Sequence, residues 1–232
     1  MGLRPNKQRA QMALILLYVI LLLNIVIFLL KLSNSVLLEL SYIGIYAPEI
    51  FHKLYYLNYQ ITYFIGYVYI AAVIISIITF IRWFRRAYFN LGVLTNECRY
   101  NDNWASNGWF VPFMNLYVPY QIMFELYEKT NNYLLEKYIS LEAHETHEKR
   151  LNTNHIKWWW FLYIILFLFY SFQVFTLSVS REYGIEITGN TFYFLSRTGL
   201  LIILNIITIS IIKNYLKTEI LLSDITANNL ST

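Results

Sequence analysis

The sequence is poor in the residues that make soluble surfaces, turns and covalent cross-links. Charged residues account for 14% of the 232 positions, and the chain contains 8 glycines, 4 prolines and one cysteine, Cys98. The shortage of glycine and proline excludes a collagen-like chain, and the shortage of charge excludes a disordered one. A single cysteine excludes a framework of disulfide bonds and indicates a reduced or redox-indifferent environment.

The sequence also lacks the short motifs by which common enzymes are recognised. No phosphate-binding loop, G-x-S-x-G nucleophile motif, H-E-x-x-H zinc motif or C-x-x-C pair occurs in it. Catalysis therefore has no positive support from the sequence, and no cofactor is expected.

Hydrophobic residues, in contrast, make up 57% of the chain, and many of them fall into four long runs. Each run has 19 to 23 residues. As a helix each would cover about 28 to 35 Å, which matches a hydrocarbon core of about 30 Å. We predict an all-α, polytopic membrane protein that forms a single integral membrane domain over residues 1–232. Its four transmembrane helices are expected at 12–30, 61–81, 158–180 and 192–212.

Basic residues are distributed unevenly between the segments that connect these runs. With the N-terminus inside, fourteen of the eighteen Lys and Arg residues lie in the inner segments. This asymmetry is what the positive-inside rule describes, so both termini are predicted to be cytoplasmic. The net charge of +4 is explained by basic residues that lie near an anionic lipid surface. No nucleic-acid partner is therefore expected.

The apolar stretch 109–127 does not fit a simple span. Pro112 and Pro119 would each remove a backbone hydrogen bond from a continuous helix, and Glu125 would lie in lipid. We therefore predict a proline-broken interfacial or re-entrant helical segment within a central cytoplasmic block, 82–157. From Pro119 onward the spacing favours an amphipathic helix with Glu125 on its polar face. A fifth span is the alternative.

Two further segments are predicted to lie on the membrane surfaces. The stretch 31–60, between the first two runs, is rich in apolar and aromatic residues and is expected to form a loop along the outer surface. The stretch 82–94 alternates arginines with aromatic and leucine residues, which is typical of a basic amphipathic helix at the inner headgroups and equally of a simple stop-transfer flank.

Several of these stretches together resemble a known family. They are R-W-F-R-R-A-Y-F-N-L from Arg82, W-F-V-P-F-M-N-L-Y-V-P-Y from Trp109, E-L-Y from Glu125, and the paired Trp158 and Trp159. The pattern is similar to the bacterial membrane family known as domain of unknown function 4328, over roughly residues 60 to 215. Its most specific positions are Trp109, Pro112, Asn115 and Pro119.

The resemblance implies a multi-pass protein of the bacterial cytoplasmic (inner) membrane. The family carries no established activity, so the resemblance transfers no catalytic residue. The chain lacks a long Pro-rich or zinc-binding extension, which leaves a regulatory partner domain without support.

Polar residues of the central block form one candidate functional cluster. Polar side chains of the stretch 82–94 could meet polar side chains of the stretch 109–127 near the membrane. Ionisable groups at such positions often have a function. The members are Arg82, Arg86, Asn90, Asn115 and Glu125. The alternative interpretation is structural: Asn115 caps the break between the prolines, and Glu125 pairs with Lys129 on the helix surface.

A second candidate is a histidine-containing loop. His144, His147 and Glu148 follow one another at helical spacing, which could suit a divalent metal. A solvated loop rich in Glu and Lys acquires such spacings by chance, and this interpretation is favoured, so no metal site is assigned.

The sequence thus favours a non-enzymatic membrane or partner-interaction protein. The expected partners are the lipid bilayer and either a second copy of the chain or another membrane protein. The alternatives are a small oligomeric transporter or channel, in which 109–127 lines a pore as a re-entrant loop, and a lipid-modifying enzyme that uses the histidine loop with a metal.

Overall fold

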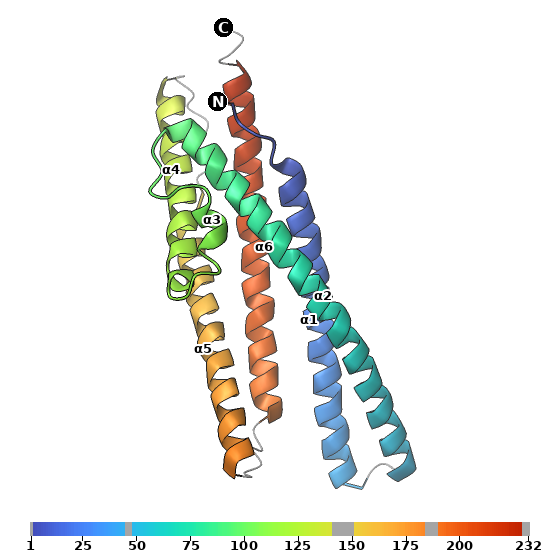
Figure 1. The fold of residues 1–232 in the computed structure, drawn as a ribbon. Helices are drawn as coiled ribbons and strands as arrows, with labels where there is room; N and C mark the ends of the chain where they lie inside the picture. The colour runs from blue at the N-terminus through green and yellow to red at the C-terminus, as the bar shows by residue number, and fades with distance from the viewer. Residues whose placement is uncertain (1, 45–47, 141–150, 184–189, 229–232) are drawn as a thin grey trace. The chain divides into compact units, whose positions relative to one another are not determined.

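The computed structural model describes residues 2–44, 48–140, 151–183 and 190–228, most of which are helical (Figure 1). No strand occurs in these four ranges, which confirms the all-α prediction. The helices are α1 Lys7–Tyr42, α2 Pro48–Thr95, α3 Trp104–Asn107, α4 Val118–Ser140, α5 Thr153–Tyr183 and α6 Asn190–Asn228, with the short 3-10 helix η1, Met114–Leu116, before α4.

Four of these helices, α1, α2, α5 and α6, are long and apolar enough to cross a membrane. Each contains one of the four predicted runs, so the prediction of four spans is confirmed at the level of length and composition. Between 11% and 33% of their most apolar stretches are buried inside the protein. Large side chains such as Phe64 and Tyr67 are about 70% exposed (71% and 69%). Such apolar surfaces are compatible with lipid as the surrounding solvent. A helix is stable in lipid because its backbone N–H and C=O groups form hydrogen bonds with one another.

All four prolines lie where a helix begins or is interrupted. Pro5 precedes α1, Pro48 is the first residue of α2, Pro112 lies between α3 and η1, and Pro119 is the second residue of α4. Proline breaks no helical hydrogen bond at these positions, because a backbone N–H there would have no acceptor within the helix. The stretch 109–127 is therefore not one continuous helix, as its two prolines predict.

The structure corrects the predicted outer loop. Residues 31–42 continue α1 and residues 48–60 belong to α2, so the predicted outer loop over 31–60 is wrong for most of its length. No glycine or proline interrupts 31–42, and Asn58 of α2 donates to the Leu30 carbonyl at 3.2 Å. At the other end of α2, residues 82–95 continue the helix, which agrees with the prediction of a helix over 82–94. The bounds of the central block stay a prediction.

The chain forms two compact units. Unit 2 comprises residues 17–75 and 162–206. Within it, Asn205 Nδ2 donates to the Leu17 carbonyl at 3.1 Å, and Arg197 donates to Gln173 Oε1 at 3.1 Å. Such bonds between helices satisfy polar groups that lipid cannot solvate.

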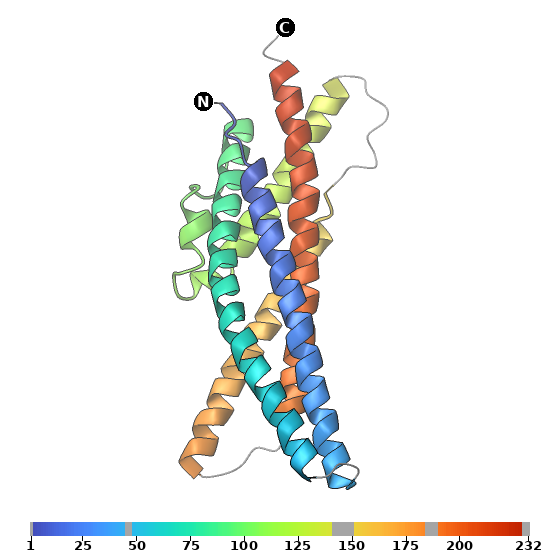
Figure 2. The same cartoon turned by 90° about the vertical axis from the view of Figure 1, so that its right-hand side faces the viewer.

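Unit 1 comprises residues 1–16, 76–161 and 207–232 and has a core of large buried side chains. Their helices, α2, α4 and α6, can be followed in Figure 2. Tyr127 of α4 stacks on Tyr215 of α6, with ring centroids 5.9 Å apart, and donates its hydroxyl to the Ile211 carbonyl at 2.7 Å. The core residues include Trp83, Phe84, Tyr88, Leu91, Ile122, Met123, Leu126, Tyr127, Ile211, Ile212 and Tyr215.

Candidate functional site

Glu125 is the centre of one polar network in unit 1. Its carboxylate accepts from the Tyr88 hydroxyl at 2.6 Å and from the Arg99 backbone N–H at 2.8 Å. It also forms an ion pair with Lys129, one helical turn further along α4, at 2.9 Å. Lys129 in turn donates to the Glu97 carbonyl. We call these groups the Glu125 network; it fastens the segment that follows α2 to α4.

The Glu125 network raises the pKa of Lys129 and of the nearby Cys98 thiol. Partial desolvation lowers the pKa of Lys129, but the hydrogen bond from Lys129 and the negative charge of Glu125 outweigh it, so this pKa lies above its ordinary value. Burial, and next the negative charge of Glu125, raise the pKa of the Cys98 thiol. Cys98 is therefore held as a thiol and is a poor nucleophile.

Glu219 is the centre of a second network, which joins α6 to α2 and to the segment that precedes α1. Its Oε1 atom accepts from Asn90 Nδ2 at 3.0 Å, and both carboxylate oxygens lie 3.1 Å from Asn6 Nδ2. Asn90 is held by the backbone of Arg4, whose N–H donates to Asn90 Oδ1 at 3.0 Å and whose carbonyl accepts from Asn90 Nδ2 at 2.9 Å. We call these four residues the Glu219 network.

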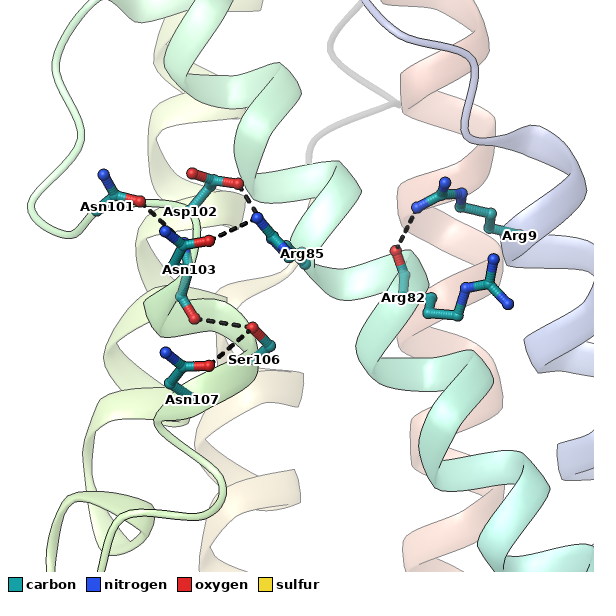
Figure 3. A network of polar contacts seen from close by, with 8 residues as sticks. All are labelled: Arg9, Arg82, Arg85, Asn101, Asp102, Asn103, Ser106 and Asn107. Atoms are coloured by element: carbon teal, nitrogen blue, oxygen red, sulfur yellow. Dashed lines mark hydrogen bonds and ion pairs between the residues drawn. The ribbon is translucent and has the colours of Figure 1, made fainter.

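Arginines near the ends of α1 and α2 make different kinds of contact (Figure 3). Arg85 forms an ion pair with Asp102 at 3.1 Å and also donates to Asn103, which holds the turn before α3 against α2. Arg9 instead donates to the Arg82 carbonyl at 3.3 Å, which places two basic residues side by side (Figure 3).

An aromatic cluster surrounds Trp109. Its ring centroid lies 5.8 Å from that of Phe80 and 6.3 Å from those of Trp159 and Trp160. Trp160 also donates to the Leu116 carbonyl at 3.2 Å, which anchors η1. Phe80 is the penultimate residue of the second apolar run, and the two tryptophans are the second and third residues of the third run. Aromatic side chains at the ends of apolar runs are typical of membrane–water interfaces.

Two phenylalanines next to this cluster are highly exposed. Phe110 is 71% exposed and Phe113 is 81% exposed. Phe113 also has φ at +64°, a left-handed conformation that a bulky residue rarely adopts. Exposed aromatic side chains on a constrained turn are available to lipid or to another protein.

The five residues of the predicted polar cluster do not form one hydrogen-bonded group. Asn90 belongs to the Glu219 network and Glu125 to the Glu125 network. Arg82 contributes its carbonyl to Arg9, Arg86 is partly exposed, and Asn115 donates its backbone N–H to the Val111 carbonyl at 3.0 Å. A functional role for these residues stays a prediction.

The amphipathic-helix prediction and the structural interpretation are wrong in one detail. They place Glu125 on a polar face directed at the cytosol, but its exposed fraction is 8%. The ion pair with Lys129 forms as the structural interpretation expected. Burial arises because Tyr88 and the Arg99 backbone close over the carboxylate, and neither partner can be inferred from the helical period of α4.

His144, His147 and Glu148 lie outside the described residues, so the histidine loop is not tested. Across the ranges that the structure describes, no three residues among His, Cys, Asp and Glu form a group that could hold a metal.

Sequence reasoning missed Asn6, Tyr88 and Glu219. A signal for Glu219 exists: Tyr215 and Leu222, four residues before and three after it, are both buried, so Glu219 shares a face of α6 with core residues. Asn6 has no comparable signal, because it precedes α1 and its partners are distant in sequence.

A family model described as domain of unknown function (DUF4328) matches residues 53–217 of the chain. Neither a curated protein nor a solved structure matches.

Proposed function

Because the chain belongs to the DUF4328 family, whose description names no activity, we propose a function from its geometry. The protein is a non-enzymatic membrane protein whose unit 1 lies against the cytoplasmic leaflet and binds lipid there. The observation that carries this proposal is the pair of exposed side chains, Phe110 and Phe113, beside an aromatic cluster at the end of the apolar runs.

The arginines support the same placement. Arg9 lies three residues before the first apolar run and Arg82 directly follows the second. Both are thus within about 5 Å of the hydrocarbon boundary at 1.5 Å per residue, inside a headgroup layer of roughly 5 to 8 Å. In the described part of the chain, neither has a carboxylate oxygen within 4.0 Å. Lipid phosphates can supply the missing negative charge.

The Glu125 network argues for a structural rather than a catalytic role. Its carboxylate already accepts a hydroxyl, a backbone N–H and an ammonium group. A general base needs a free lone pair directed at a substrate proton. The Cys98 thiol, with its raised pKa, is equally unsuited to nucleophilic attack.

The proposal includes an orientation and partners. Both termini face the cytoplasm of a bacterium, as the distribution of basic residues indicates. The lipid bilayer is the main partner, and a second copy of the chain or another membrane protein can contact the same exposed aromatic side chains.

The test measures which solvent surrounds residue 113. A spin label is attached to Phe113→Cys in a Cys98→Ser background, and the full chain is placed in lipid nanodiscs. We expect stronger relaxation by oxygen, which dissolves in lipid, than by a water-soluble nickel complex. Glu128→Cys, on the exposed face of α4, is the matched control and should show the opposite preference.

Two results would contradict this proposal. Preference of the label at residue 113 for the nickel complex would place the turn in water. Reaction of Phe113→Cys with an impermeant thiol reagent from both sides of sealed vesicles would favour the channel, with 109–127 lining a pore.

A further inference from the structure

A cavity of about 460 Å³ lies beside the Glu219 network within unit 1. Its walls come from the segment before α1, the last turns of α2 and the last turns of α6. This volume is in the range of small-molecule sites. The apolar part of the wall includes Leu3, Leu94, Leu216 and Ile220, and the polar part includes Asn6, Asn90 and Glu219.

Within the described ranges, the carboxylate in this cavity accepts hydrogen bonds from neutral groups only. Asn6 and Asn90 donate to Glu219 through side-chain amides. Among the residues that the structure places, no Lys, Arg or His nitrogen lies within 4.0 Å of this carboxylate. A partly buried carboxylate with no opposite charge is unfavourable, and a cation that enters the cavity would remove that penalty.

The nearest basic residues of the wall are occupied elsewhere or lie in water. The guanidinium group of Arg4 lies 4.1 Å from the centre of the Phe89 ring, which is not part of the cavity wall. Lys7 is exposed. In addition, Asn6 is 4% exposed, and its side-chain amide is held against Glu219. Among the described residues of the wall, the Glu219 carboxylate is therefore the acceptor available to a positively charged ligand.

The pocket is also organised before any ligand binds. The Arg4 backbone fixes both polar atoms of Asn90, and Asn90 in turn orients the Glu219 carboxylate. Preorganised acceptors bind a ligand at a lower entropic cost than mobile ones.

The position of the cavity indicates where its ligand comes from. Glu219 lies seven residues after Ile212, the end of the fourth apolar run, which corresponds to about 10 Å at 1.5 Å per residue. The headgroup layer extends roughly 5 to 8 Å beyond the hydrocarbon core, so the cavity lies on its aqueous side. Arg9 and Arg82, by contrast, lie inside that layer.

We propose that this cavity binds a small water-soluble organic cation, a primary ammonium group on a short aliphatic body, with Glu219 as its counter-charge. The ammonium group donates to the Glu219 carboxylate, and the aliphatic body contacts Leu94, Leu216 and Ile220. A bare divalent metal fits less well, because Glu219 is the only carboxylate among the described residues of the wall and such ions prefer six or more oxygen ligands. This site is independent of the lipid contact proposed above.

The test uses the full chain in phosphatidylcholine nanodiscs and titrates it with n-butylammonium chloride by isothermal calorimetry. We expect saturable binding, and no saturable binding of n-butanol, which has a similar shape without the charge. Glu219→Gln should weaken butylammonium binding by roughly tenfold or more, since a charge-assisted hydrogen bond is lost. Glu136→Gln, which removes the same charge at an exposed site on α4, should bind as the unaltered chain does.

A second variant keeps the test decisive if Glu219→Gln disturbs the fold. Leu94→Trp fills the cavity and leaves the carboxylate in place, and it should also abolish binding while the chain stays monodisperse. The proposal is overturned if the unaltered chain gives no saturable binding, if both variants bind normally, or if butanol binds as well as butylammonium. Tighter competition by magnesium or calcium chloride would also overturn it in favour of a metal site.

The same ammonium group occurs in the phosphatidylethanolamine headgroup. The titration is therefore repeated in nanodiscs that contain phosphatidylethanolamine. An unchanged affinity for butylammonium supports a water-soluble amine. A weaker apparent affinity would assign the cavity to the lipid amine and overturn the water-soluble source.

Discussion

Single polar side chains join segments of unit 1 that apolar packing alone would not fix in register. Glu125 holds Tyr88 of α2 and the backbone of Arg99, and Glu219 holds Asn6 and Asn90. Each of these hydrogen bonds joins two defined groups, and removal of one group leaves the other without that partner. Substitution of a single polar residue in either network should therefore lower the stability of unit 1.

Glu125→Ala should destabilise the protein by about 1 to 3 kcal/mol, because the buried Tyr88 hydroxyl and the partly buried Arg99 backbone N–H lose their acceptor. The free energy of unfolding, measured by denaturant titration in mixed micelles, provides the check. Glu128→Ala, an exposed change on the same helix, should stay within about 0.5 kcal/mol. Equal stability of the two variants would show that the Glu125 network contributes nothing.

Cys98 should react slowly with iodoacetamide, and its reaction should have a pH midpoint above that of an ordinary thiol. The thiolate is the reactive form, and the raised pKa means that less of it is present at any pH below the midpoint. Glu125→Gln should move the midpoint down, since it removes a negative charge, while burial keeps it above the ordinary value. Glu128→Gln is the control. A midpoint that matches that of the denatured chain would contradict this assignment.

At the scale of elements, the decisive feature is the break between α3 and α4. Gly108 ends α3 and packs directly on Val118, the first residue of α4. A Cβ atom at position 108 would lie 2.8 Å from the Trp104 carbonyl oxygen and 2.9 Å from Val118 Cγ1. Glycine is thus required here for a close approach, and Pro112 and Pro119 keep the chain from continuing as one helix.

Gly108→Ala should therefore destabilise the contact between α3 and α4 by about 1 to 3 kcal/mol, the usual cost of overpacking. Gly66→Ala in α2, where no atom lies within 4 Å of the added Cβ, is the matched control. Limited proteolysis of the segment between residues 95 and 118 should accelerate in the first variant only. Similar cleavage rates in both would mean that α3 can shift to accept the methyl group.

At the scale of the whole molecule, exposure of apolar residues and the distribution of charge decide its place in the cell. Four helices carry long apolar stretches of which at most a third is buried. In water these surfaces would drive aggregation, whereas in lipid they face a solvent of matching polarity. The membrane therefore replaces much of the core that a soluble protein would need.

The orientation can be checked with reporter fusions. A reporter that works only in the cytoplasm should be active when it is joined after Glu148, and one that works only in the periplasm should be inactive there. The reason is that the segment between the second and third runs carries half of the basic residues. A reporter joined after Gln11, directly in front of the first apolar run, serves as a second cytoplasmic control. A periplasmic signal after Glu148 would require a fifth crossing and would refute the assigned topology.

Much of the architecture follows from the sequence alone. The four spans, the interruption at Pro112 and Pro119 and the family were all predicted, because hydrophobicity and the backbone limits of proline act locally along the chain. The length of α1 and α2 was not predicted. Their ends beyond the apolar runs mix polar and aromatic residues, and such a composition suits a helix as well as a surface loop.

The two polar networks could be found only in the tertiary structure. Asn6 meets Glu219 across 213 sequence positions and Asn90 meets it across 129, so no periodicity within one helix reveals either contact. Sequence determined which segments leave water, since that depends on each segment's own composition. Packing between helices decided which buried carboxylate meets which amide, because only a folded chain brings distant side chains within hydrogen-bond reach.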